Sequence, residues 1–358
     1  MTTPIAQINL DALHHNFSVV KAYAPDSKVL VVLKANGYGH GIVRIAKTLL
    51  EADAFGVSRV DEALMLRQAG VTHPIVAMTG FSDLEELKAC AQFDVQVVIH
   101  SDYQIDYLEQ NNLVKPITVW FKIETGLGRL GFPIDKIQLA YQRLMACSQI
   151  KKPMITLSHL ASADNVSNPK TAQQLARFQK ITASFEGPQS LARSAAIISN
   201  PDTHLDWVRP GLMLYGASPF PNEVGSDRGL QAVMTMKSQL ISINHIPKGE
   251  TVGYGETWKC EEDMPVGVVG FGYADGYPRN MTQGTPVLIN GVRCPLIGRV
   301  SMDMITVDLR TCPHAKIGDV AILWGPELPI EIIAKGANTT PYNLWVNISS
   351  RVKFVEKP

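Results

Sequence analysis

An excess of charge of either sign is missing from this 358-residue sequence, in which 33 lysines and arginines balance 33 aspartates and glutamates. Without a basic excess or a charged block, we expect no binding to nucleic acid or to a membrane surface. No apolar run approaches the roughly 20 residues that cross a bilayer. The N-terminus also lacks the basic and apolar regions of a secretory signal. We therefore expect a cytoplasmic protein.

Paired cysteines are also missing. The five cysteines are an odd number, and no two of them form a C-x-x-C pair; they are Cys90, Cys147, Cys260, Cys294 and Cys312. This pattern argues against a disulfide framework and against a thiolate zinc site. We expect no metal.

Short apolar runs alternate with helix-like segments through the first 215 residues. Eight such units predict a (β/α)₈ barrel. The continuous apolar character of the runs suits strands that are buried on both faces. The eight runs cover residues 28–34, 54–58, 74–80, 95–100, 117–124, 154–159, 190–197 and 206–216.

The last third of the chain has a different pattern, with short alternating segments typical of a mainly β structure. Asn290-Gly291 lies between two apolar runs, which is a strong hairpin signal. We predict a barrel domain over 1–229 and a mainly β domain over 230–358. The boundary is expected in the Pro- and Gly-rich segment 219–229, and residues 1–10 are candidates for either domain.

Five polar side chains fall at or just after the predicted barrel strands. Active sites of this fold collect at the C-terminal ends of the strands. Each side chain taken alone has an ordinary structural explanation, but five on one rim predict a functional site. Lys34 ends the first strand, Arg129 follows the fifth, His159 ends the sixth, and Ser194 and Arg209 lie in the seventh and eighth.

A lysine in a barrel mouth suits Schiff-base formation with an aldehyde cofactor. Partial burial and nearby cations favour its free amine, because both disfavour the charged form. Ser194 and the backbone N–H groups near Gly211 and Leu212 follow the last two strands, where this fold often binds phosphate. Lysine, phosphate cradle and barrel together suggest pyridoxal 5′-phosphate (PLP).

Residues 126–131 form a literal G-x-G-x-x-G between a predicted strand and a predicted helix. A dinucleotide-binding loop of this type also needs an acidic residue about 20 positions further on. No aspartate or glutamate occurs between Lys136 and Ala163. We therefore expect these glycines to turn the backbone tightly while Arg129 points into the mouth.

The sequence resembles the alanine racemase family of fold-type III PLP enzymes over essentially its whole length. The segments that carry the resemblance, in order, are VLKANGYGHG, KIETGLGRLGF, SHLASAD, WVRPGLMLYG, VGYGETW, GFGYADGYPR and GRVSMDMITVDL. The resemblance implies a barrel domain, a β domain and a homodimer whose active sites are shared between subunits. It implies PLP-dependent racemisation of L-alanine and D-alanine, which supplies D-alanine for cell-wall peptidoglycan.

Residue roles follow from the same resemblance. Lys34 is implied to carry the cofactor and to act as one of two bases, and Tyr254 of the partner subunit is implied to be the second. Racemisation needs an acid/base group on each face of the substrate carbanion. The cofactor is implied to contact Tyr38, Ser194, Arg209, Gly211 and Leu212.

The substrate side is also assigned by resemblance. Arg129 is implied to bind the cofactor's phenolic oxygen and the substrate carboxylate, and His159 to link Tyr254 with Arg209. The carboxylate site is implied to be completed by Tyr273, Met302 and Asp303, and Lys122 matches a lysine that is carbamylated in some relatives.

Alternatives remain open at this stage. They are a broad-specificity amino-acid racemase, a PLP decarboxylase of similar architecture and a non-catalytic PLP-binding protein. Arg209 opposite the pyridine nitrogen favours a racemase, because a decarboxylase is expected to place a carboxylate there. The chain departs from the family at Arg193, where Asn is frequent, and at Ser350, where a phosphate-contacting tyrosine is frequent.

Overall fold

The computed structural model describes residues 3–357, which separate into two compact units. The barrel unit comprises Phe17–Leu214 and Pro219–Pro221. The β unit takes in the chain up to Asn16, Tyr215–Ser218 and the chain from Asn222 onward. The division after residue 229 remains our proposal for the domain boundary.

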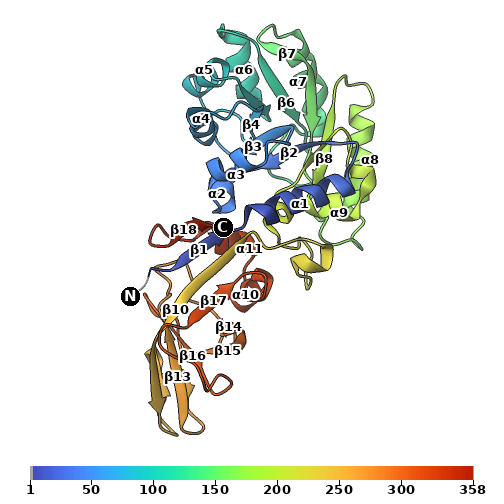
Figure 1. The fold of residues 1–358 in the computed structure, drawn as a ribbon. Helices are drawn as coiled ribbons and strands as arrows, with labels where there is room; N and C mark the ends of the chain where they lie inside the picture. Colours follow the sequence, from blue (N-terminus) through green and yellow to red (C-terminus); the bar gives the residue numbers. More distant parts are fainter. Residues whose placement is uncertain (1–2, 358) are drawn as a thin grey trace. The chain divides into compact units, whose positions relative to one another are not determined.

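The barrel unit contains a closed parallel barrel, which confirms the predicted fold class (Figure 1). Every strand interior is rich in buried Val, Ile, Leu or Phe, because helices cover the outside and side chains fill the inside. The first and last strands close the ring with Val29 opposite Val208. The strands are β2 (Lys28–Val32), β3 (Ala54–Val57), β4 (Ile75–Ala77), β5 (Val95–Ile99), β6 (Ile117–Lys122), β7 (Ile150–Leu157), β8 (Gln189–Arg193) and β9 (Trp207–Arg209).

Helices follow the barrel strands, and α1 (Leu10–Tyr23) precedes the first strand. The longer of these helices bury apolar residues on one face and carry charged residues on the other, which is the pattern expected of helices that pack on a barrel. They are α2 (Lys34–Tyr38), α3 (Ile42–Thr48), α4 (Val60–Gln68), α5 (Leu84–Gln92), α6 (Asp102–Gln110), α7 (Ile134–Ala146), α8 (Lys170–Thr182) and α9 (Ser194–Ser199).

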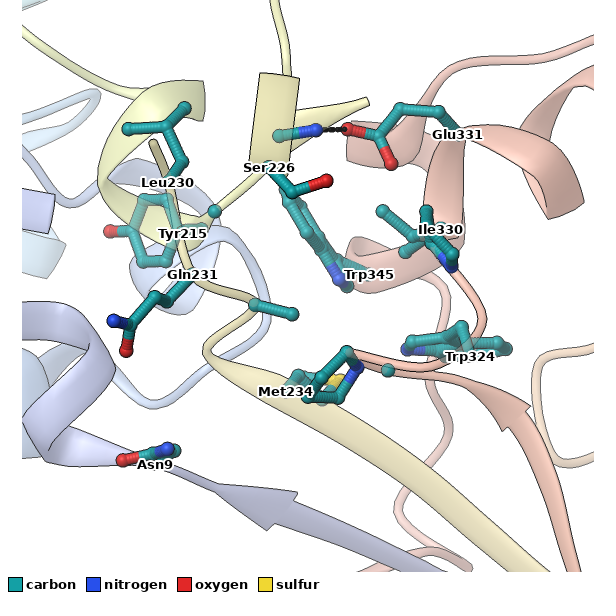
Figure 2. Close-up of a pocket in the computed structure, with 16 residues that line it drawn as sticks. Asn9, Tyr215, Ser226, Leu230, Gln231, Met234, Trp324, Ile330, Glu331 and Trp345 are labelled. Atoms are coloured by element: carbon teal, nitrogen blue, oxygen red, sulfur yellow. Dashed lines mark hydrogen bonds between the residues drawn. The ribbon is translucent and has the colours of Figure 1, made fainter. Parts of the chain in front are cut away.

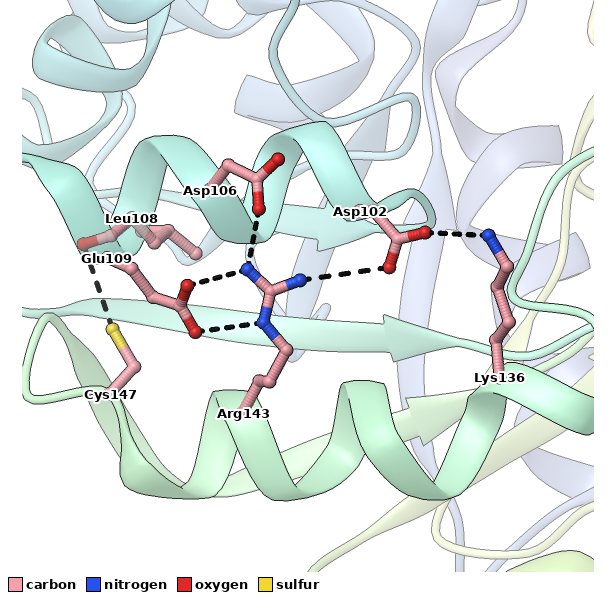
Figure 3. Close-up of polar contacts among 7 residues, drawn as sticks. All are labelled: Asp102, Asp106, Leu108, Glu109, Lys136, Arg143 and Cys147. Atoms are coloured by element: carbon pink, nitrogen blue, oxygen red, sulfur yellow. Dashed lines mark hydrogen bonds and ion pairs between the residues drawn. The ribbon is translucent and has the colours of Figure 1, made fainter.

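Ion pairs join two neighbouring helices on the outside of the barrel (Figure 3). Arg143 of α7 contacts three carboxylates of α6, with 2.5 Å to Asp106 and 2.6 Å to Glu109. Lys136 lies 3.0 Å from Asp102, which also faces Arg143. These groups are partly exposed, so each pair contributes at most about 1 kcal/mol to the stability of the helix pair.

The β unit is built on a mixed sheet in which β10 is the long central strand. The order is β13-β16-β15-β14-β17-β10-β1-β18, and β13 also pairs with β10. The N-terminal strand lies between β10 and β18, so the two ends of the chain join one sheet. The strands are β1 (Ile5–Ile8), β10 (Met234–Ile246), β13 (Met264–Val269), β14 (Pro286–Ile289), β15 (Val292–Ile297), β16 (Ile305–Asp308), β17 (Val320–Trp324) and β18 (Lys353–Glu356).

The predicted hairpin is confirmed, since Asn290-Gly291 joins β14 to β15. Asn290 has φ 52° and Gly291 has φ 76°, the left-handed pair that a two-residue hairpin requires. The rest of the unit adds the short pair β11 (Thr251–Val252) and β12 (Trp258–Lys259) and the helices α10 (Ile330–Gly336) and α11 (Pro341–Val346). Within residues 3–357, no helix has the length and apolar character needed to cross a bilayer.

Candidate active site

Lys34 follows the first barrel strand and starts an unusual turn. Ala35, Asn36, Gly37 and Tyr38 all have positive φ, between 50° and 61°. Left-handed backbone costs roughly 1–2 kcal/mol for each residue other than glycine. Four such residues in succession persist only where their surroundings hold them, which is a feature of functional sites.

Several hydrogen bonds hold this left-handed turn. Gly37 N–H donates to Leu33 O at 2.7 Å, and Ala35 N–H donates to Glu62 Oε1 at 2.8 Å. The Asn36 side chain accepts the Ile42 N–H at 3.0 Å at the start of α3. The glycine-rich segment that follows Lys34 is therefore an ordered turn that fixes the direction of the lysine.

Arg209 ends the last barrel strand and is 3 % exposed. Its guanidinium donates to Ser190 Oγ, to Ser158 O at 2.6 Å and to Leu191 O at 3.1 Å. Burial lowers the pKa of Arg209 to about 10, so the group is still charged at neutral pH. Its Nε is buried and has no hydrogen-bond partner among residues 3–357. An unsatisfied buried donor is costly, so this Nε points to an acceptor from outside the chain.

Lys122, at the end of β6, is 8 % exposed and surrounded by cations. Burial, Arg209 and Arg129 lower the pKa of Lys122 to about 8, and Glu124 opposes them. The Lys34 side chain reaches solvent, yet desolvation by the surrounding protein and the Arg129 charge lower its pKa as well. The barrel mouth therefore gathers positive charge that suits an anionic ligand.

His159 lies two residues after β7 and faces the same cations. Burial, then Arg209 and Arg193, hold the pKa of His159 well below its usual range. The imidazole is therefore neutral at pH 7, with one nitrogen as donor and the other as acceptor. Its backbone carbonyl accepts a hydrogen bond from Gln174 at 3.0 Å, which orients this loop.

The prediction that Ser194 lies in the seventh barrel strand is wrong. Ser194 is the first residue of helix α9. Its Oγ accepts N–H groups from Gly211 at 2.9 Å and Met213 at 3.4 Å. The Tyr38 hydroxyl also lies close to Gly211: a Cβ built on this glycine would be 2.8 Å from the hydroxyl oxygen. A hydroxyl pair and backbone N–H groups thus meet at one spot of the barrel unit.

The loop that resembles a dinucleotide fingerprint is closed by its own chain. The Glu124 carboxylate accepts the backbone N–H groups of Gly126, Leu127 at 2.6 Å, Gly128 at 2.9 Å and Arg129 at 3.3 Å. In a dinucleotide site these N–H groups would face a pyrophosphate. Here a carboxylate already occupies them, so the loop serves to position Arg129.

The predicted site residues of the β unit lie on adjoining segments. Ala274 N–H donates to Met302 O at 2.9 Å, and the Asp303 carboxylate accepts Arg351 at 2.8 Å. A Cβ on Gly255, beside Tyr254, would meet the Arg299 guanidinium at 3.2 Å. Tyr254 is 72 % exposed and Met302 53 %, so this surface displays large apolar groups.

A cavity of about 300 Å³ lies within the β unit (Figure 2). Glu331 borders it and accepts the N–H groups of Ser218 and Gly225 at 2.8 and 2.9 Å. Burial raises the pKa of Glu331. None of the predicted site residues lines this cavity. Among residues 3–357, no cluster of three or more His, Cys, Asp and Glu could hold a metal ion.

Comparisons with known proteins cover the whole chain. Residues 8–219 match the family model "Alanine racemase, N-terminal domain" and residues 233–356 match "Alanine racemase, C-terminal domain". The chain belongs to the alanine racemase family.

Individual relatives agree. An alanine racemase of Coxiella burnetii (strain Dugway 5J108-111) is 47% identical, with 99% of each chain covered. One of Nitrosococcus oceani is 48% identical over 98% of this chain and 99% of its own. The biosynthetic alanine racemase structure from Pseudomonas aeruginosa has a TM-score of 0.97, 36% identity and full coverage of both chains. The alanine racemase of Bartonella henselae, solved with covalently bound pyridoxal phosphate, has a TM-score of 0.89, 28% identity and full coverage of both chains.

Two acidic residues of this alanine racemase family site escaped the sequence analysis. Glu62 holds the turn after Lys34, and Glu124 holds the loop before Arg129. Glu62 was visible as the third residue of a helix, where a carboxylate often caps the preceding turn. Glu124 was visible as an acid just before a glycine-rich loop whose N–H groups converge.

Proposed function

We propose that the chain interconverts L-alanine and D-alanine in a homodimer with PLP bound in the barrel mouth, and supplies D-alanine for peptidoglycan. The observation that carries the proposal is the buried Arg209 Nε, which has no partner among residues 3–357. PLP offers a ring nitrogen as acceptor, and its phosphate and phenolic oxygen match the cationic mouth. When bound, it supplies an electron-withdrawing ring that stabilises charge at the substrate α-carbon.

The phosphate would bind where Tyr38 and Ser194 meet the backbone N–H groups of Gly211 and Leu212. The Ser194 Oγ accepts hydrogen bonds from the backbone N–H groups of Gly211 at 2.9 Å and Met213 at 3.4 Å. These bonds hold the segment in place and support a preformed phosphate site. A Cβ at Gly211 would collide with Tyr38. Only glycine therefore leaves room for the tyrosine hydroxyl at this point.

Arg209 would select the reaction at the other end of the cofactor. A guanidinium holds its proton at neutral pH, even where burial lowers the pKa of Arg209 to about 10. It would therefore donate a hydrogen bond while leaving the ring nitrogen unprotonated. This weakens the electron sink, which suppresses side reactions such as transamination. A decarboxylase is expected to place a carboxylate at this position, so the arginine favours a racemase.

Two acid/base groups are needed because the proton must leave from one face and return on the other. Lys34 would serve one face, and its lowered pKa increases the fraction of free amine. Tyr254 of the partner subunit would serve the other face, supported by the 72 % exposure of this side chain. A neutral His159 would accept one hydrogen bond and donate another, linking the partner's Tyr254 to Arg209.

Arg129 would bind the phenolic oxygen of the cofactor and the substrate carboxylate. Tyr273, Met302 and Asp303 of the partner subunit would complete the carboxylate site. Lys122 is proposed as a carbamylation site, since its pKa of about 8 leaves more neutral amine to react with carbon dioxide. A carbamate would turn an unfavourable cation into an anion that pairs with Arg129. The cytoplasmic location stays a prediction.

One incubation tests the proposed function. Purified protein is mixed with PLP and L-alanine, and D-alanine is measured by chiral chromatography, with serine, lysine and arginine in parallel. We expect D-alanine from the wild type and none from Lys34→Ala, with Lys180→Ala of α8 as the surface-lysine control. Borohydride reduction and peptide mapping should place the cofactor on Lys34. Absence of D-alanine, or label on another lysine, would contradict the proposal.

A further inference from the structure

We propose that Glu62 is the positioning residue of Lys34: one carboxylate oxygen holds the left-handed turn that directs Lys34 and Tyr38 into the mouth. The inference rests on the proposed role of Lys34. Glu62 lies on α4, after the second barrel strand, and is not expected to touch cofactor or substrate. It acts through the backbone of the turn Lys34–Tyr38.

The Glu62 carboxylate joins two βα loops. Oε2 accepts the N–H groups of Ser58 at 2.8 Å and Arg59 at 3.3 Å, which closes the start of its own helix. Oε1 reaches the neighbouring loop and accepts the N–H of Ala35 at 2.8 Å. Ala35 directly follows Lys34 and has φ 52°, a conformation that an alanine rarely adopts without external support.

The next βα loop of the barrel provides a natural comparison. Ser82 and Glu86 repeat the spacing of Ser58 and Glu62 at the start of α5. Glu86 Oε2 accepts the Ser82 N–H at 2.8 Å and the Ser82 hydroxyl at 2.9 Å. Both glutamates thus close their own loop, and the bond to Ala35 distinguishes Glu62.

Glu62 also opposes the cations that face Lys34. Those cations are Arg129, from the loop after β6, and Lys122 at the end of β6. Arg129 lowers the pKa of Lys34 and Glu62 raises it. Removing the negative charge should therefore lower the pKa of Lys34 further, and the amine should become reactive at lower pH.

The experiment compares Glu62→Gln and Glu62→Asp with the matched control Glu86→Gln in the full-length protein. One readout is hydrogen–deuterium exchange of the peptide that covers residues 34–41. The second is the pH midpoint for covalent binding of PLP after removal of bound cofactor, with Lys34→Ala as baseline. The third is the separate change in kcat and KM for L-alanine.

In Glu62→Gln we expect about tenfold faster exchange at residues 34–41. The pH midpoint should be lower, and kcat should fall roughly ten- to a hundredfold with little change in KM. Glu86→Gln should match the wild type in all three. Glu62→Asp keeps the charge but loses reach, so it should exchange faster with an unchanged pH midpoint.

Exchange and pH midpoint in Glu62→Gln equal to those of Glu86→Gln would overturn the inference. If Glu62→Gln does not fold, wild-type exchange in Glu62→Asp would overturn it and faster exchange would support it. The proposed function fails separately, since covalent PLP binding by Lys34→Ala would remove Lys34 from its role whatever Glu62 does.

Discussion

The barrel mouth and the surface around Tyr254 differ in how far contacts within the chain bury and hold their side chains. In the mouth, Arg209 donates three hydrogen bonds from a buried position. Burial and then neighbouring cations lower the pKa values of Lys122 and His159. In the β unit, Tyr254 and Met302 are largely exposed. Large exposed apolar groups in one patch are typical of an interaction surface. On the proposed function, the barrel would provide an ordered half-site, and the β unit would complete the half-site of a second subunit.

Among the variants that test this difference, Tyr254→Phe should have the largest effect on catalysis. Loss of one acid/base group should lower kcat for alanine racemisation by roughly 10²- to 10⁴-fold. Covalent PLP binding should not change, because all the proposed cofactor-binding groups belong to the barrel unit. Chiral chromatography measures the first and absorbance of bound PLP the second. The control is Tyr23→Phe on α1, and wild-type racemisation in Tyr254→Phe would remove the second base.

A smaller effect is expected for Arg209→Lys, which keeps a charge in the mouth but loses the planar guanidinium. Lysine can release a proton to the ring nitrogen, whereas arginine does not. D-alanine formation should fall roughly tenfold to a hundredfold, from loss of an oriented donor. Pyruvate, the product of transamination, should rise and can be followed with a coupled dehydrogenase. Arg143→Lys on the outer helix pair is the control, and unchanged pyruvate would contradict the proposed role of Arg209.

The smallest expected effect is on the free energy of unfolding, whose pH dependence tests whether Lys122 is an unmodified, buried lysine. Its folded-state pKa of about 8 lies below the ordinary value of 10.5, so the unfolded chain binds more protons between these limits. Stability should therefore rise from about pH 8 to about pH 10.5. Lys122→Met should remove this slope and stabilise the cofactor-free protein at pH 7 by up to about 3 kcal/mol.

Urea unfolding at pH 7 and pH 9.5 measures this difference, with Lys151→Met as an exposed control. A wild-type protein without the slope would indicate that Lys122 is carbamylated, and the slope should then appear after bicarbonate is removed. A destabilised Lys122→Met at pH 7 under bicarbonate-free conditions would contradict the account of an unfavourable buried cation.

Much of the fold could be predicted because strands buried on both faces leave continuous apolar runs. The eight runs and the Asn290-Gly291 hairpin were local signals of this kind. Ser194 was misplaced because buried apolar residues lie on both sides of the junction between Arg193, the last residue of β8, and Ser194, the first residue of α9. Composition does not show where a buried strand becomes a buried helix.

The details of the site depend on contacts that are distant in sequence. The glycines and the asparagine after Lys34 are typical of a turn, but its left-handed course through Ala35 depends on Glu62, 27 residues away. The buried Arg209 guanidinium likewise depends on backbone carbonyls from elsewhere in the barrel. They belong to Leu191 in β8 and to Ser158, which directly follows β7. Such partners become evident only when the barrel is closed.

The most direct test of the central claim, that each barrel mouth is completed by the β unit of a second subunit, uses a hybrid dimer. Lys34→Ala and Tyr254→Phe chains are co-expressed with different affinity tags, and the doubly tagged dimer is isolated. Each parent dimer should be nearly inactive. The hybrid contains one site with both Lys34 and Tyr254, so it should recover about half of the wild-type racemisation per dimer. A hybrid no more active than its parents would contradict the shared site.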